Sequence, residues 1–312
     1  MAQATVTSTT AQVTSPRRKR KGVGRHRVAG FLFTAPFMVL FLALFIAPLI
    51  YALYLSLFRE QLVGGNAFVG LENYTEGIKD KLFTDGVRRV ALFMVVQVPI
   101  MLFLALVFAL IIDSGKVLLG KLYRVAFFVP YAVPTVIAAL LWGFLYGRDF
   151  GPFADLADTL GVAAPNFLGE STMLWSMANV ITWTFTGYNM IIFYAALRAI
   201  PAELYEAAAV DGAGPVRTAI HVKLPLLRPA LLLCTIFSVI GSFQLFAEPR
   251  VFYDIAPQVI GKSYTPNLYV YNLAFADQRL NYAAALSFLL GLVVFIVSFL
   301  VMYASNRQES RR

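Results

Sequence analysis

Long apolar runs separated by shorter polar segments make up most of this 312-residue chain. Six of the runs reach about 20 residues, the length that a helix needs to cross a hydrocarbon core about 30 Å thick. The pattern therefore predicts an all-α membrane protein with six transmembrane helices. We place the spans at 28–58, 90–112, 125–147, 174–197, 230–247 and 282–304, so that residues 28–304 form one membrane domain.

The segments outside this domain are polar. Residues 1–27 combine a Ser/Thr/Ala-rich stretch with a basic cluster and carry too little apolar surface to offset the entropy of ordering. We therefore expect a disordered, basic N-terminal tail, and a short C-terminal tail at 305–312. The apolar run that follows the basic cluster is too long for a signal peptide and lacks a small-residue cleavage site, so it is predicted to be the first span.

Composition supports a membrane protein without chemistry of its own. Apolar residues make up 59% of the chain and charged residues 14%, whereas soluble domains carry about 25% charged residues. A net charge of +9 in so apolar a chain indicates membrane topology rather than nucleic-acid binding. Two His and one Cys are too few for a metal cage or a His-based catalytic site, so no enzyme is predicted.

The charges also predict the orientation. With six spans, the segments that share a side with the two termini carry 17 Lys and Arg against 5 Asp and Glu, and those on the other side carry 9 against 12. Because basic residues accumulate on the cytoplasmic side, both termini and the segment 200–229 are predicted to be cytoplasmic.

The segment 200–229 is a polar, helix-prone stretch between two long apolar spans. Pro201 can open a helix, and the alanines at 207–209 favour one. Gly212 and Pro215 then predict a bend into a second short helix. We expect that second helix to end at Leu224-Pro225 and Pro229, just before the fifth span.

Several residues of this segment resemble the cytoplasmic EAA loop of permease subunits in binding-protein-dependent ABC importers. They are Glu206, Ala207, Ala208, Asp211, Gly212, Leu224 and Pro225. Segments at 68–74, 124–142 and 269–287 are similar to the carbohydrate branch of that family, the maltose and glycerol-phosphate type. The resemblance implies a six-helix permease whose helix around Glu206 lies in a cleft of the ATPase and moves when the ATPase dimer closes.

The same resemblance implies the partners and the location. They are a second permease subunit, ABC ATPase subunits, an extracytoplasmic solute-binding protein and a sugar, in a bacterial cytoplasmic (inner) membrane, with no nucleic acid. This chain would bind no cofactor, because ATP and Mg belong to the ATPase. The sequence departs from the pattern of many members of that family at 253–257 and 151–154, both on the predicted outer side, so the identity of the sugar stays open.

Polar side chains at helical spacing are candidates for the substrate path. They are Asn179, Thr182, Thr186 and Asn189 in the fourth span, and Ser238, Ser242 and Gln244 in the fifth. A sugar needs neutral hydrogen-bonding groups and aromatic faces, which Trp175, Trp183, Tyr188 and Phe243 would supply. The same polar residues also fit a role as contacts between helices or back to their own helix.

The sequence is compatible with two other functions. The same machine would carry a non-sugar solute such as glycerol phosphate if a basic residue lined the path, yet the predicted spans contain no Lys, Arg or His. An ATPase-independent carrier usually needs an ionisable group in its spans, and Asp and Glu are absent there as well. A phosphate-loop-like match at 256–263 lies in a loop of about 34 residues, too short for a nucleotide-binding domain, so the ATPase must be a separate chain.

Overall fold

The computed structural model describes residues 23–61, 65–115, 117–149 and 151–309, in two compact units that divide after Tyr51. The first unit contains α1 (Val23–Phe41), a π-helical turn η1 (Leu42–Ile46) and the start of α2 (Ala47–Ser56). Its side chains from Phe31 onward are exposed or half-buried. The predicted disordered tail lies outside the described residues up to position 22, whereas residues 23–27 are already helical.

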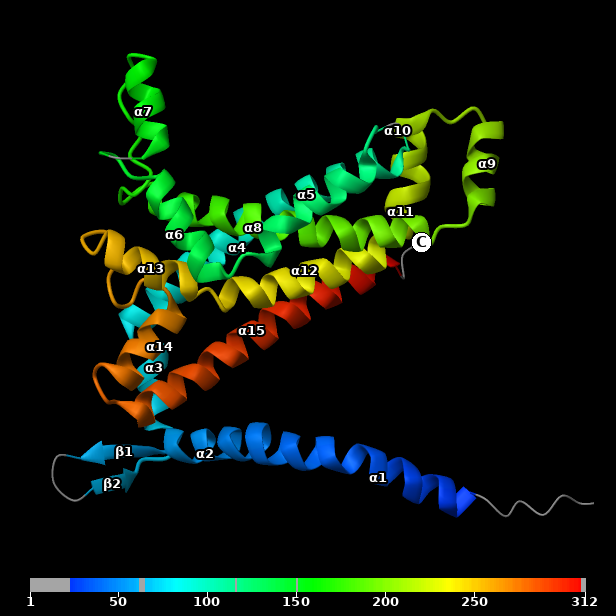
Figure 1. Cartoon of the computed structure of the whole chain (residues 1–312). Helices are drawn as coiled ribbons and strands as arrows, with labels where there is room; N and C mark the ends of the chain where they lie inside the picture. The colour runs from blue at the N-terminus through cyan, green and yellow to red at the C-terminus, as the bar shows by residue number, and fades with distance from the viewer. Residues whose placement is uncertain (1–22, 62–64, 116, 150, 310–312) are drawn as a thin grey trace, which may run out of the picture. The chain divides into compact units, whose positions relative to one another are not determined.

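The second unit is a set of long helices with short elements at both ends. Its elements are β1 (Phe58–Gln61), β2 (Gly65–Phe68), α3 (Glu72–Lys79), α4 (Lys81–Asp113), α5 (Gly120–Ala132), α6 (Thr135–Leu145), α7 (Pro152–Thr159), α8 (Met173–Arg198), α9 (Ala202–Val210), α10 (Pro215–Thr218), η2 (Ala219–Lys223), α11 (Leu224–Leu226), α12 (Arg228–Phe243), α13 (Ala247–Ile255), α14 (Pro266–Phe275) and α15 (Leu280–Glu309). Helices α3, α13 and α14 lie at one end of α12 and α15, and α9, α10 and α11 lie at the other end of α8 and α12 (Figure 1).

Within the part of the chain that the structure describes, five helices are long and apolar enough to cross a membrane, and a bent pair brings the number to six. The five are Phe31–Ser56, Lys81–Asp113, Met173–Arg198, Arg228–Ile255 and Leu280–Ser305. The predicted third span is not one helix, because α5 and α6 meet at an angle of 96°. Pro134 has no N–H to continue the helix, and it holds Val133 in an extended conformation (φ −76°, ψ 126°).

Two smaller features differ from the predicted all-helical pattern. Strands β1 (58–61) and β2 (65–68) pair antiparallel, with Phe58 opposite Phe68, after the first membrane-length helix ends at Ser56. The second helix of the segment 200–229 also continues where we expected it to stop. Pro225 and Pro229 lie in the first turn of a new helical segment, where the missing N–H has no partner to lose, so α11 and α12 follow η2 with only Leu227 between them.

The helices that hold the site pack closely. A buried cluster that includes Met101 and Ala105 of α4, Phe193 of α8 and Cys234 of α12 joins these three helices. Helix α5 approaches α8 at Gly187, where a Cβ atom would lie 1.7 Å from the backbone oxygen of Phe127. Helix α4 contains one proline, Pro99, close to the middle of its length.

Candidate functional site

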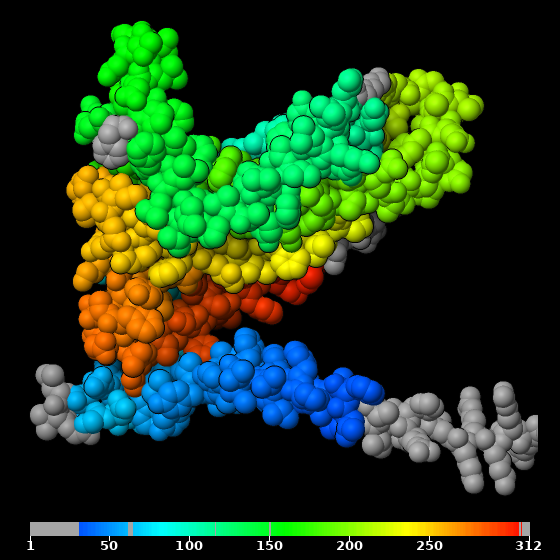
Figure 2. Space-filling model, in the orientation of Figure 1, coloured from blue at the N-terminus to red at the C-terminus, as the bar shows by residue number. Residues whose placement is uncertain are grey.

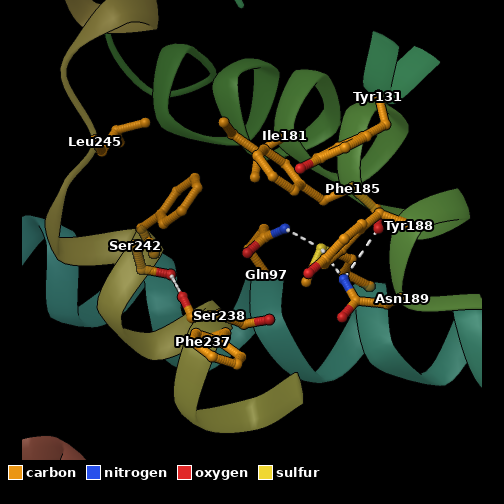
Figure 3. A pocket seen from close by; sticks show the side chains of 13 residues that line it. Gln97, Tyr131, Ile181, Phe185, Tyr188, Asn189, Phe237, Ser238, Ser242 and Leu245 are labelled. Atoms are coloured by element: carbon orange, nitrogen blue, oxygen red, sulfur yellow. Dashed lines mark hydrogen bonds between the residues drawn. The ribbon is translucent and has the colours of Figure 1, made fainter. Parts of the chain in front are cut away.

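A cavity of about 230 Å³ lies between α4, α5, α8 and α12. Figure 3 shows amide and hydroxyl side chains and aromatic rings around it, with Phe237 beside Ser238 and Tyr188 beside Asn189. Helix α4 contributes Gln97, α8 contributes Asn189, and α12 contributes Ser238 and Ser242. The residues that line the cavity include no charged side chain, so it suits a neutral ligand.

The polar groups of the cavity are buried and only partly paired. Gln97 is 2% exposed, and its Nε2 donates to Thr182 Oγ1 and Met101 Sδ, both at 3.3 Å. Asn189 is 3% exposed, and its Nδ2 donates to the carbonyl of Phe185 at 3.0 Å. Among the described residues, no donor reaches the amide oxygen of either side chain. A ligand hydroxyl therefore has two acceptors available.

Aromatic rings also line the cavity. Tyr131 of α5 stacks on Tyr188 with 4.6 Å between ring centroids, and its edge meets Phe185 at 5.6 Å. The apolar lining also includes Phe93, Phe237, Met101, Ile181 and Leu245. Flat apolar faces beside neutral acceptors match a sugar ring, which has C–H faces and hydroxyl edges.

The structure brings together three of the seven residues predicted for the path, namely Asn189, Ser238 and Ser242. Thr182 lies just outside and accepts from Gln97, and the Thr186 hydroxyl donates to the carbonyl of Thr182 at 2.5 Å. The other two lie elsewhere. Asn179 donates to the hydroxyl of Tyr146 at 2.8 Å, and Gln244 is an exposed residue at the end of α12.

The predicted aromatic faces divide in the same way. Tyr188 lines the cavity, whereas Trp183 packs edge-on against Trp142 and Phe243 is buried in a separate cluster. Sequence reasoning missed Gln97 and Tyr131. The signal for Gln97 was available, because it is the single polar side chain between residues 90 and 112.

The segment 200–229 forms the bend that its residues predict. Helix α9 buries Ala208 and presents Glu203, Glu206, Ala207 and Val210 on its exposed face. Gly212 follows the end of α9 and has φ +71°, a left-handed backbone conformation that costs free energy in residues with a Cβ atom. No atom lies within 4 Å of the position that its Cβ would take. The space-filling view shows α9 and α10 standing out at one end of the helices (Figure 2).

The remaining residues of the predicted ATPase-coupling set follow the same bend. Asp211 is exposed at the end of α9, and Leu224 and Pro225 are half-buried in α11. The phosphate-loop-like segment 256–263 has no described strand before it and follows α13, with Ile260 buried in the core. It therefore lacks the strand–turn–helix setting of a nucleotide site.

Comparison with known proteins decides the family. A family model described as the inner membrane component of binding-protein-dependent transport systems matches residues 101–312, about two thirds of the chain, including the bend and all the cavity residues from Met101 onward. The chain belongs to this family. The permease is thus a multi-pass inner membrane protein and a transport subunit rather than an enzyme.

Similar proteins span nearly the whole permease. The lactose transport system permease protein LacF of Rhizobium radiobacter is 32% identical over 288 residues, covering 90% of this chain and 95% of LacF. The arabinooligosaccharides transport system permease protein AraP of Bacillus subtilis is 30% identical over 286 residues, covering 90% and 89%. The fold matches a chain of a bacterial ABC transporter that imports the acidic polysaccharide alginate, with a TM-score of 0.78, 17% identity and coverage of 91% and 96%.

Proposed function

We propose that this permease carries a neutral sugar or oligosaccharide along a path through the cavity between α4, α5, α8 and α12. The observation that carries the proposal is the uncharged lining, which combines the amide oxygens of Gln97 and Asn189, without a donor among the described residues, with the stacked rings of Tyr131 and Tyr188. The names of LacF and AraP support a saccharide as the transported solute. A phosphorylated solute such as glycerol phosphate is disfavoured, because no Lys or Arg lines the cavity.

The energy would come from a separate ABC ATPase that docks on the exposed face of α9. Glu206 offers a charge to a basic partner, Ala207 allows close approach, and Gly212 allows the bend. ATP and Mg would bind on the ATPase, and this chain would bind no cofactor. A second permease subunit would complete the path. Both termini and α9 would face the cytoplasm, and a solute-binding protein would dock at the opposite end, near α7, α13 and α14.

The experiment that tests this proposal is a gentle-detergent pull-down of the tagged chain from its native membrane. We expect an ATP-binding subunit and a second permease to co-purify with the wild-type chain. Gly212→Val forces a β-branched side chain into the left-handed region and should release the ATPase. Gly214→Val is the matched control, because Gly214 has φ −70° and equally open space.

Either result is informative. Loss of the ATPase in Gly212→Val but not in Gly214→Val would support docking at this bend. A wild-type chain that purifies alone would contradict the importer and leave an ATPase-independent carrier as the working hypothesis.

A further inference from the structure

A buried ion pair connects the bend to the end of the second predicted span. Lys223, the last residue of η2, places its Nζ 2.5 Å from Oδ2 of Asp113, the last residue of α4. The two side chains are 15% and 7% exposed. The pair therefore joins two segments that are 110 residues apart in the chain and excludes most water from the contact.

Tyr205 extends this contact to α9 and α8. The Lys223 ammonium lies 5.1 Å from the centre of the Tyr205 ring, a cation–π contact. The Tyr205 hydroxyl donates at 3.3 Å to the carbonyl of Leu197 near the C-terminus of α8, which also accepts from the backbone N–H of Ile200 at 3.2 Å. Burial and the charge of Asp113 raise the pKa of Tyr205, although Arg198 lowers it, so the hydroxyl keeps its proton.

Stability alone does not account for this arrangement. A carboxylate at a helix C-terminus, where Asp113 lies, is repelled by the helix dipole. Burying an ion pair also costs desolvation energy that its attraction seldom exceeds, so apolar residues of similar size would often hold the segments together as well. The ion pair instead determines a specific arrangement, because it holds η2 against the C-terminal end of α4.

We propose that Tyr205, Lys223 and Asp113 form a positioning cluster that transmits movement of α9 to α4 and α8. These two helices supply more than half of the residues that line the cavity, among them Gln97 and Asn189. Displacement of α9 acts on α8 through Tyr205 and on α4 through Lys223. The inference rests on the proposed function, since it needs an ATPase that moves α9.

The test measures the accessibility of the cavity and does not require the sugar to be identified. Cys234, the single cysteine, is buried and is replaced by alanine, and Ser238→Cys then places a reporter thiol in the cavity. In the purified complex with its ATPase and second permease, the probe is N-ethylmaleimide, and the readout is its labelling rate with and without MgATP and vanadate. ATP hydrolysis is measured in parallel.

We expect Lys223→Met to reduce the ATP-dependent change in labelling rate about tenfold, a typical coupling between two sites, while hydrolysis continues. The exchange Asp113→Lys with Lys223→Asp should restore the change. Arg217→Met is the matched control, because it removes the same charge from the same segment and Arg217 has no ion pair among the described side chains.

Two results would overturn the proposal. One is a full ATP-dependent change in Lys223→Met. The other is an exchanged pair that restores assembly but not the change in labelling, which would assign the pair to folding alone. If Lys223→Met does not assemble, Tyr205→Phe decides, because it removes only the hydroxyl bond to Leu197 and an unaltered response would contradict the cluster. Absence of a co-purifying ATPase would instead contradict the proposed function.

Discussion

Gln97 brings the main polar group of α4 into the cavity. Gln97→Leu keeps the volume but removes the acceptor and the donor to Thr182, so we expect uptake of the transported sugar to fall about tenfold, the cost of one buried hydrogen-bonding group. The measurement is uptake of labelled sugar by cells that depend on this importer, with expression checked in parallel. Gln244→Leu is the control, because that amide is exposed and outside the cavity. Equal uptake by the two variants would remove Gln97 from the path.

Gly187 sets the distance between α5 and α8. In Gly187→Ala the new methyl group would lie 1.7 Å from a backbone oxygen, so the helices must separate. We expect a loss of about 3 kcal/mol or more, above the usual range for overpacking because backbone rather than side chain must move. Thermal unfolding in detergent measures the loss. Gly291→Ala should unfold at the wild-type temperature, because nothing lies within 4 Å of that position; a similar drop in both variants would refute the close approach.

At the scale of elements, one carboxylate joins α4 to α14 and α15. Asp80 caps α4 through Oδ1, which accepts from the backbone N–H of Leu82 at 2.9 Å. Its Oδ2 accepts from the hydroxyls of Tyr269 at 2.8 Å and Tyr282 at 2.9 Å. Burial and this hydrogen bond raise the pKa of Tyr269, so its hydroxyl remains a donor.

Asp80→Ala should therefore destabilise the protein by about 3 kcal/mol, from the lost cap and two unpaired buried hydroxyls. The melting temperature of the purified chain is the measurement. Asp85→Ala, one turn further along α4, removes an exposed carboxylate that has no ion pair among the described residues, and it should change little. If both variants had the same melting temperature, the contacts of Asp80 would contribute no more to stability than an exposed surface carboxylate.

The elements also show how far sequence reasoning reached. Apolar run lengths located five helices because a span needs a minimum length, and the Gly212 bend followed from residue types with strong backbone preferences. Helical spacing placed Asn179 and Asn189 on one stripe, but they lie ten residues, about 15 Å, apart and meet different neighbours. Only tertiary packing decides that Tyr146 binds the first while the second lines the cavity. The sharp turn at Pro134 was hidden by continuous apolar composition.

At the scale of the whole molecule, the distribution of Lys and Arg predicts which ends face the cytoplasm. A direct test is possible because the chain has a single cysteine, Cys234, which is 1% exposed. Replacing it with alanine gives a protein without cysteine, into which one reactive cysteine is introduced at a time. In that background, Ser171→Cys should react with a membrane-impermeant maleimide added outside cells, whereas Val216→Cys should react only after the membrane is opened. Both positions are exposed in the structure, so any difference in their reaction with the maleimide reports the side of the membrane on which they lie. The reverse pattern would invert the topology and place α9 beyond the reach of an ATPase.

Helix α4 has a mechanical consequence that follows from Pro99. With 33 residues it is about 50 Å long, and side-chain contacts hold it at Asp80 and at Asp113. Pro99 lies between the cavity residues Gln97 and Met101 in the chain. Because it has no N–H, the carbonyl of Val95 has no helical donor four residues later. A helix that is held at both ends bends most easily where a backbone hydrogen bond is missing. We therefore expect any bending of α4 to concentrate at the turn that contains Pro99, next to the cavity residues Gln97 and Met101.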